Sequence, residues 1–242
     1  MSNGMPPNQT VEEIEIPQVL SADQVNDFVQ KMATSIDHVS FNNIATIEQL
    51  SNAYAVFNKM KETRPELDTH VNVNTEISKL IELNSSNPAL LEWVAPKVTY
   101  LNDMNFIQHE NQMHLFTNIT NISNFQITNK DGTLNRSLFS KLNRFNKLQY
   151  LYFSCSKWGQ SIPDDTSDTT TFDVIVDQLP RSLQTISVSN LSYVKWDDFE
   201  PFVETLATRR PNLTIEMYGL KSILESRPRM MELVNSRSVV TN

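Results

Sequence analysis

Two histidines that flank a glutamate, His109 and His114 around Glu110, are the residues of this sequence that come nearest to a metal site. A helix binds zinc through two histidines when they share one face, which requires a spacing of three or four residues. Here the histidines are five residues apart. That spacing separates them by roughly 140° around a helix axis. The sequence therefore predicts no metal site.

The sequence also shows no complete set of residues for nucleophilic or acid–base catalysis. Cys155 is the only cysteine, and it ends an alternating apolar segment, where a buried structural thiol is expected. The carboxylates Asp164-Asp165 fall in a turn-rich loop, and Asp197-Asp198 fall at a predicted helix start, where acidic residues stabilise the helix dipole. No G-x-S-x-G nucleophile elbow is present. We therefore predict a protein that is not an enzyme and has no cofactor.

Charge and composition argue against several classes of ligand. The net charge of −8 disfavours nucleic acid, because its binding rests on clustered lysine and arginine. Arg209-Arg210 is assigned to a helix C-terminus, where cations are favourable, and not to a basic patch. The four glycines are too scattered to form a glycine-rich phosphate loop.

The lengths of the apolar runs and the cysteine count bear on membrane binding and on the cell compartment. No apolar run is long enough to span a membrane, and the first residues have neither the basic nor the apolar region of a secretion signal. A single cysteine fits a reducing compartment. We therefore expect an intracellular protein of the cytoplasm or nucleus that does not bind membranes.

The elements that must position these residues form a repeat. Seven short segments with apolar residues at alternate positions recur every 26 to 35 residues: HVSFNN, HVNVN, KVTYLN, NFQITN, YLYFSC, TISVSN and TIEMYG. Alternation of this kind is typical of half-buried strands. Between them, residues 44–60, 134–145 and 199–208 have apolar residues three and four apart, which predicts helices. Strands that alternate with helices predict a parallel sheet in an α/β fold.

The phase of the alternation assigns inward positions in each strand. The first inward residues are Val39, Val71, Val98, Phe125, Leu151, Ile186 and Ile215. The second are Phe41, Val73, Tyr100, Ile127, Phe153, Val188 and Met217. A third column of mostly small or polar residues, including Asn129, Cys155 and Asn190, falls where each strand should end. Short side chains there could satisfy backbone groups as the chain turns away from the sheet.

Two of the units carry a family pattern. Residues 148–155 read L-x-x-L-x-F-x-C and residues 183–190 read L-x-x-I-x-V-x-N. Over residues 36–219 the chain resembles the divergent leucine-rich-repeat superfamily, such as the repeats of yeast F-box and related adaptor proteins, without a clear F-box. Its asparagine and serine content is also yeast-like. The resemblance implies a leucine-rich-repeat-like solenoid with about seven short parallel strands on the concave face and helices on the convex face.

The ends and one interruption complete the predicted organisation. Residues 1–16 are polar and acidic and predict a flexible tail, and residues 17–242 are expected to form a single domain. Within it, residues 17–35 form an N-terminal cap helix, residues 36–219 the repeats and residues 220–242 a C-terminal cap helix. Ser161–Thr171 is expected to protrude as an acidic loop, either as a tolerated insertion or as a regulatory docking segment.

The residues between the inward positions form the predicted site. They are nearly uncharged, and tyrosine beside small polar residues suits protein recognition. The candidate partner-binding residues are Asn72, Thr99, Gln126, Tyr152, Ser187, Glu216 and Tyr218. We therefore predict a protein–protein interaction module, such as a substrate-recognition or scaffold subunit, whose open solenoid ends could also support self-association. The alternative is an enzyme of a non-repeat α/β fold whose site is assembled from scattered carboxylates and hydroxyls.

Overall fold

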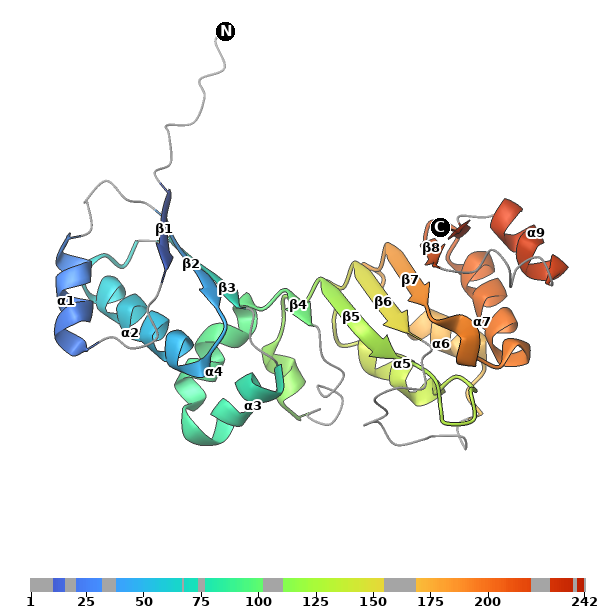
Figure 1. Ribbon diagram of the computed structural model, residues 1–242, viewed down its shortest axis with the longest axis horizontal. Helices are drawn as coiled ribbons and strands as arrows, with labels where there is room; N and C mark the ends of the chain where they lie inside the picture. The colour runs from blue at the N-terminus through green and yellow to red at the C-terminus, as the bar shows by residue number, and fades with distance from the viewer. Residues whose placement is uncertain are drawn as a thin grey trace, which may run out of the picture. The chain divides into compact units, whose positions relative to one another are not determined.

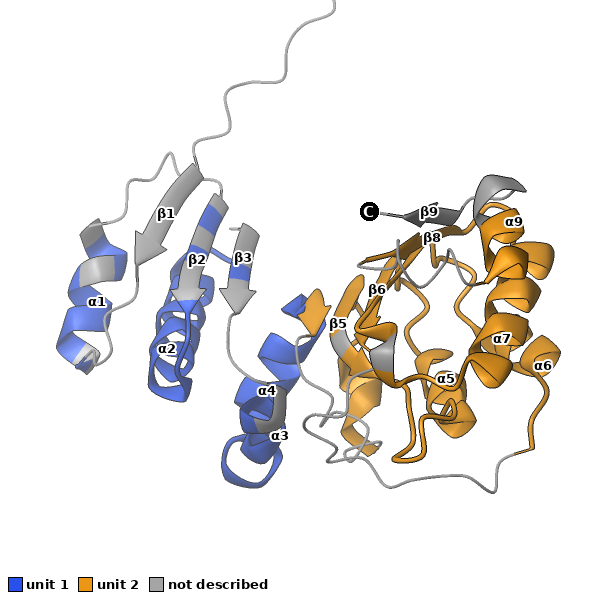
Figure 2. Ribbon diagram, turned by 45° about the vertical axis from the view of Figure 1, so that its right-hand side comes forward, with its two compact units in different colours: residues 1–98 blue, residues 99–242 orange. Residues whose placement is uncertain are grey.

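The computed structural model describes residues 11–15, 21–31, 38–66, 68–73, 77–101, 111–154, 169–218, 227–236 and 239–241. The chain divides into two compact units, residues 1–98 and residues 99–242 (Figure 2). Each unit has a parallel β-sheet of its own. The prediction that residues 17–242 form one domain stays a prediction.

The first unit is a three-stranded parallel sheet with helices. Its elements are β1 (Val11–Glu15), α1 (Ala22–Lys31), β2 (His38–Ile44), α2 (Ile47–Thr63), β3 (Asp68–Val73), α3 (Ile77–Ser86), α4 (Pro88–Val94) and the 3-10 helix η1 (Ala95–Lys97). The strand order in the sheet is β1-β2-β3 (Figure 1). Val39, Phe41 and Val71 are buried, so the predicted inward phase is confirmed at these positions.

Polar side chains fix where the helices of this unit begin. Thr46 Oγ1 accepts a hydrogen bond from the Gln49 N–H at 3.1 Å, and Gln49 Oε1 accepts in return from the Thr46 N–H at 3.2 Å. Ser21 and Gln24 make the same reciprocal pair before α1. Each pair satisfies two backbone donors that a helix start leaves unpaired. Ser21 therefore caps the start of α1.

The second unit contains the larger sheet. Its elements are β4 (Tyr100–Leu101), β5 (Asn121–Gln126), α5 (Arg136–Leu142), β6 (Tyr150–Ser154), α6 (Phe172–Gln178), β7 (Thr185–Ser189), the 3-10 helix η3 (Leu191–Tyr193), α7 (Trp196–Arg209), β8 (Thr214–Met217), α9 (Pro228–Ser236) and β9 (Val239–Thr241). The six strands lie in chain order, and every neighbouring pair is parallel. Helices α5, α6 and α7 lie on one side of this sheet (Figure 2).

An aromatic core joins those helices to the sheet. The Phe202 ring of α7 lies 5.0 Å from the Phe139 ring of α5 and 5.6 Å from the Phe172 ring of α6, centroid to centroid. Phe139 also contacts Phe153 of β6 edge to face at 6.5 Å. Phe139, Phe153 and Phe202 are fully buried. Burial of such rings contributes about 1.5–3 kcal/mol each, so the helices are held to one face of the sheet.

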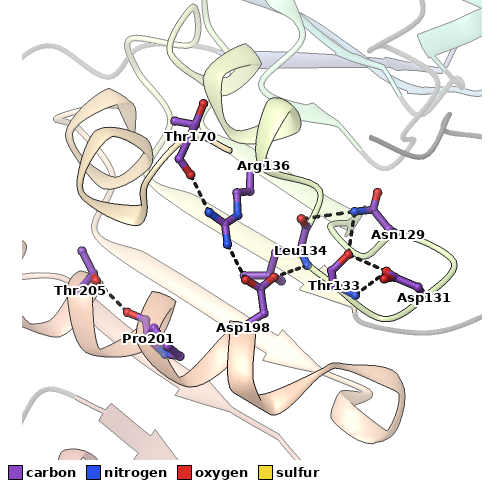
Figure 3. A network of polar contacts seen from close by, with 9 residues as sticks. All are labelled: Asn129, Asp131, Thr133, Leu134, Arg136, Thr170, Asp198, Pro201 and Thr205. Carbon is purple, nitrogen blue, oxygen red and sulfur yellow. Dashed lines mark hydrogen bonds and ion pairs between the residues drawn. The ribbon is translucent and has the colours of Figure 1, made fainter. Parts of the chain in front are cut away.

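A polar latch ties α7 to the start of α5 (Figure 3). Asp198 Oδ2 accepts a hydrogen bond from the Leu134 N–H at 2.7 Å, and its Oδ1 pairs with Arg136 Nη2 at 2.6 Å. Arg136 also donates to the Thr170 carbonyl at 2.8 Å and lies over the Phe172 ring at 4.2 Å. One carboxylate thereby holds the segments before α5 and α6 against α7.

The structure confirms an α/β fold with parallel sheets and adds elements that the sequence analysis missed. Each of the seven predicted strands lies at or beside one of β2 to β8. Two further strands occur: β1 falls within residues 1–16, assigned to a tail, and β9 falls within residues 220–242, assigned to a cap helix. Within the described part of the chain, no helix is long and apolar enough to cross a membrane.

Candidate functional site

The side of the second sheet opposite α5, α6 and α7 carries a cluster of tyrosines. Tyr100, Tyr150 and Tyr218 are 50%, 45% and 38% exposed, whereas alternate residues such as Leu151 and Ile215 are buried. Strand register places Tyr150 beside Thr185, and Tyr152 beside Ser187. We call this surface the tyrosine face: Tyr100, Ser123, Tyr150, Tyr152, Ser154, Thr185, Ser187, Thr214, Glu216 and Tyr218. Among these residues, only Glu216 carries a charge.

Hydrogen bonds between strands hold several of these side chains in place. Tyr152 Oη donates to Ser189 Oγ at 2.7 Å, which ties β6 to β7. Glu216 Oε2 accepts from Ser187 Oγ at 2.6 Å and from Tyr218 Oη at 3.0 Å. At the other end of the sheet, Tyr100 Oη and Ser123 Oγ lie 2.6 Å apart. Side chains fixed in this way lose less conformational entropy on binding.

Four of the seven predicted partner-binding residues meet on the tyrosine face. Tyr152, Ser187 and Glu216 lie on three adjacent strands, in register, and Tyr218 follows directly after β8. This grouping follows from the period-two phase, which holds through β6, β7 and β8. Whether the cluster binds a partner stays a prediction.

The other three predicted residues lie elsewhere. Gln126 was expected to point outward, but it is buried, with 9% exposure, because a register shift between Ile122 and Phe125 breaks the alternation of β5. Thr99 is exposed and precedes β4. Asn72 belongs to β3 in the first unit, and its side chain lies outside the described residues.

Two tyrosines of this face were missed. Tyr100 was predicted to point inward after Val98, but it is exposed, and Leu101 takes the buried position instead, so the predicted phase is wrong in β4. Tyr150 precedes Tyr152 by two residues and therefore shares its face. That spacing could have identified Tyr150 from the sequence alone.

In the column of residues at the strand ends, Asn129 and Asn190 have described side chains, and their environments differ. Asn129 is buried, and its Nδ2 donates to Thr133 Oγ1 at 3.0 Å and to the Leu134 carbonyl at 3.4 Å (Figure 3). Asn190 is exposed with φ of 56°, and its Nδ2 donates to Ser154 Oγ at 3.1 Å. Asn129 therefore stabilises its own turn, whereas Asn190 connects the end of β7 to the end of β6. Cys155 lies outside the described residues.

The described residues gather no set of metal ligands. They contain no group of three or more histidine, cysteine, aspartate or glutamate residues that could hold a metal ion. His114 Nδ1 donates to its local backbone, 2.7 Å from the Asn111 carbonyl oxygen. His109, Asp164 and Asp165 lie outside the described part of the chain.

Acidic residues near the strand ends have structural partners. Lys195 Nζ lies 2.7 Å from Asp131 Oδ2. Hydrogen bonds from Lys195 and then from Thr133 lower the pKa of Asp131 to about 2. Asp198 belongs to the latch beside α5, whereas Asp197 is exposed in the first turn of α7. The predicted placement of this pair at a helix start is therefore confirmed.

Comparison with known protein families, with curated proteins and with solved structures gives no match. The resemblance to leucine-rich repeats therefore stays a prediction that rests on the sequence pattern.

Proposed function

We propose that this protein is a non-catalytic interaction module that binds a protein partner through the tyrosine face. The observation that carries the proposal is the exposure of Tyr100, Tyr150 and Tyr218 on one side of a sheet whose other side packs against helices. Tyrosine contributes a large contact area for only two rotatable bonds, and it is enriched among the residues that dominate binding energy.

The charge of this face sets the chemistry of the partner. Glu216 is the one charged residue of the tyrosine face, and only its Oε2 accepts the bonds from Ser187 and Tyr218. A carboxylate with acceptor capacity remaining, beside the ring of Tyr218, suits a lysine or arginine. The partner that fits is a protein surface with a basic residue at its centre and polar or apolar neighbours.

We also propose that the strands and helices within each unit are stacked repeats of the leucine-rich-repeat type. Strand order follows chain order in both sheets, and neighbouring strands are parallel. One strand per coil produces this order. Repeats of this kind serve recognition, which supports a substrate-recognition or scaffold subunit in an intracellular complex.

The test compares captured partners and then measures affinity directly. The first step identifies proteins that the wild-type chain retains and that a Tyr150→Ala/Tyr218→Ala variant loses. These proteins are then purified and titrated against both chains by calorimetry. We expect the affinity to fall by at least about tenfold for each tyrosine, because such residues contribute about 2 kcal/mol or more when they anchor an interface. A Glu216→Gln variant should weaken binding and reduce its dependence on salt.

Val174→Ala is the matched control, because Val174 is 44% exposed on α6, on the helical side of the sheet. Circular dichroism and melting temperature establish that each variant is folded. A partner that binds the double tyrosine variant as tightly as the wild type would remove the tyrosine face from the proposal.

A further inference from the structure

A cavity of about 440 Å³ lies at the beginning of β7 and β8, lined by residues 181–184 and 209–213. The two segments meet because each precedes one of two neighbouring parallel strands, and the Thr214 N–H donates to the Gln184 carbonyl at 2.9 Å. Three arginines line the cavity: Arg181, Arg209 and Arg210. This is a concentration of positive charge in a chain whose net charge is −8.

Arg209 is already neutralised by aspartates of α6. Its Nε and Nη2 donate to the two carboxylate oxygens of Asp177 at 3.0 and 2.5 Å, and Nη1 lies 3.1 Å from Asp173 Oδ1. The hydrogen bonds that Arg209 donates to Asp177 are the main reason why the pKa of Arg209 is raised. Arg209 therefore forms one wall of the cavity without supplying an uncompensated charge.

Arg210 is held differently. Its guanidinium donates to the carbonyls of Pro180 at 3.0 Å, Leu179 at 3.4 Å and Leu183 at 3.5 Å. These neutral acceptors fix the side chain, but they do not balance its charge. Among the described residues, no carboxylate forms an ion pair with Arg210. Partial burial lowers its pKa by desolvation, and the charge of the nearby Asp177 opposes this effect only in part. Arg210 is a fixed cation with donors to spare, because a guanidinium has five N–H groups.

Arg181 lines the cavity, is exposed, and makes no hydrogen bond or ion pair with the described residues. The cavity has three arginines, and two aspartates pair with Arg209. The local net charge is therefore +1. The negative charge of the remaining chain opposes an anion only weakly beyond about 8 Å at physiological salt. The local charge therefore decides what the cavity attracts.

We propose that this cavity binds a phosphate group, presented as a phosphate monoester. Guanidinium groups match phosphate oxygens through paired N–H donors, and Gln184, Ser182 and Asn212 add polar side chains to the lining. A planar carboxylate fills one guanidinium fork, whereas a phosphate can accept from two arginines at once. One water occupies about 30 Å³, and a phosphate group is only a few times larger than a water. The cavity volume of about 440 Å³ therefore also admits the group that carries the phosphate. This proposal does not depend on the proposed function of the tyrosine face.

The test measures binding of inorganic phosphate, O-phosphoserine and acetate to the full chain by calorimetry at constant ionic strength. We expect saturable binding of both phosphates and at least about tenfold weaker binding of acetate. Arg181→Gln should weaken phosphate binding about tenfold or more, because hydrogen bonds to charged groups contribute on the order of 1.5–3 kcal/mol. Arg144→Gln, which removes an exposed arginine outside the cavity, should leave the affinity unchanged.

Arg210→Lys is the second variant, because it retains the charge and removes the guanidinium fork. It should also weaken phosphate binding, and its melting temperature without phosphate reports any separate loss of stability. A phosphoserine peptide that binds more tightly than O-phosphoserine would assign the group to a modified protein, and equal affinity would assign it to a small phosphate ester. Equal affinities in the wild type and Arg181→Gln, or equal binding of acetate and phosphate, would overturn the proposal.

Discussion

Gly132 lies in the turn between β5 and α5, with φ of +85°. L-residues with a side chain rarely adopt this conformation, because their Cβ approaches the backbone. A Cβ at this position would also lie 2.5 Å from the Tyr193 carbonyl oxygen. The Gly132 carbonyl accepts from the Lys195 N–H at 2.7 Å, so the residue connects the turn after β5 to the turn after β7.

Gly132→Ala should destabilise the protein by on the order of 1–3 kcal/mol, because the strained backbone and the close contact add to each other. Urea unfolding followed by circular dichroism measures the loss. Lys130→Ala is the control, since it removes an exposed side chain from the same turn and leaves the backbone conformation available. An alanine variant as stable as the wild type would show that the turn rearranges without cost.

Asp198 connects three elements through one carboxylate. It accepts from the buried Leu134 N–H and pairs with Arg136, which lies over Phe172 at the start of α6. The neighbouring Asp197 lies in the same first turn of α7 but is exposed. Both residues interact with the α7 dipole, so the difference between them isolates the contribution of the latch.

Asp198→Ala should therefore cost about 1.5–3 kcal/mol more than Asp197→Ala, because it leaves a buried N–H without its acceptor and a half-buried guanidinium without its ion pair. Parallel urea titrations of the two variants give this difference. Equal losses from the two substitutions would mean that the dipole alone accounts for the role of Asp198.

At the scale of elements, strands were easier to predict than helices. The period of two is visible in short segments such as residues 150–154 and 185–189, which form β6 and β7. Helix α6 was missed, because its sequence FDVIVDQ has β-branched residues that favour strands locally, and packing against α7 decides its structure. The missed strands β1 and β9 are short, and β9 falls within the predicted C-terminal cap helix. Their pairing with β2 and β8 determines them.

The predicted site residues lie on the tyrosine face where buried and outward residues alternate without interruption along a strand. They lie elsewhere where this alternation is broken. Tyr152, Ser187 and Glu216 come from three regular strands. The prediction for Gln126 is wrong because a register shift interrupts the pairing of β5 with β6, and no local sequence pattern reports such a shift. The arginine-lined cavity was missed because Arg181 and Arg210 are 29 positions apart in the sequence and meet only through the pairing of β7 with β8.

At the scale of the whole molecule, each of the two units has its own sheet and its own buried residues. The second unit contains six strands and the aromatic core around Phe202. A unit with a core of its own has the means to fold alone.

Residues 99–242 should therefore fold without residues 1–98 and unfold in one cooperative transition. The measurement is thermal unfolding of the isolated segment, together with an amide NMR spectrum that overlays on that of the full chain. Residues 136–242, which lack β4 and β5, are the control and should lose cooperativity. An unfolded 99–242 segment would instead support the single domain expected from the sequence.

The strands at the two ends of the larger sheet are its shortest: β4 has two residues and β9 has three. An unpaired strand edge is a template on which another chain can add, and this is the route to edge-to-edge aggregation and amyloid. Edges this short offer few free backbone groups to an incoming strand. In a concentrated preparation, a sheet that ends in this way resists growth into fibres, although its interior strands are regular and apolar on one face.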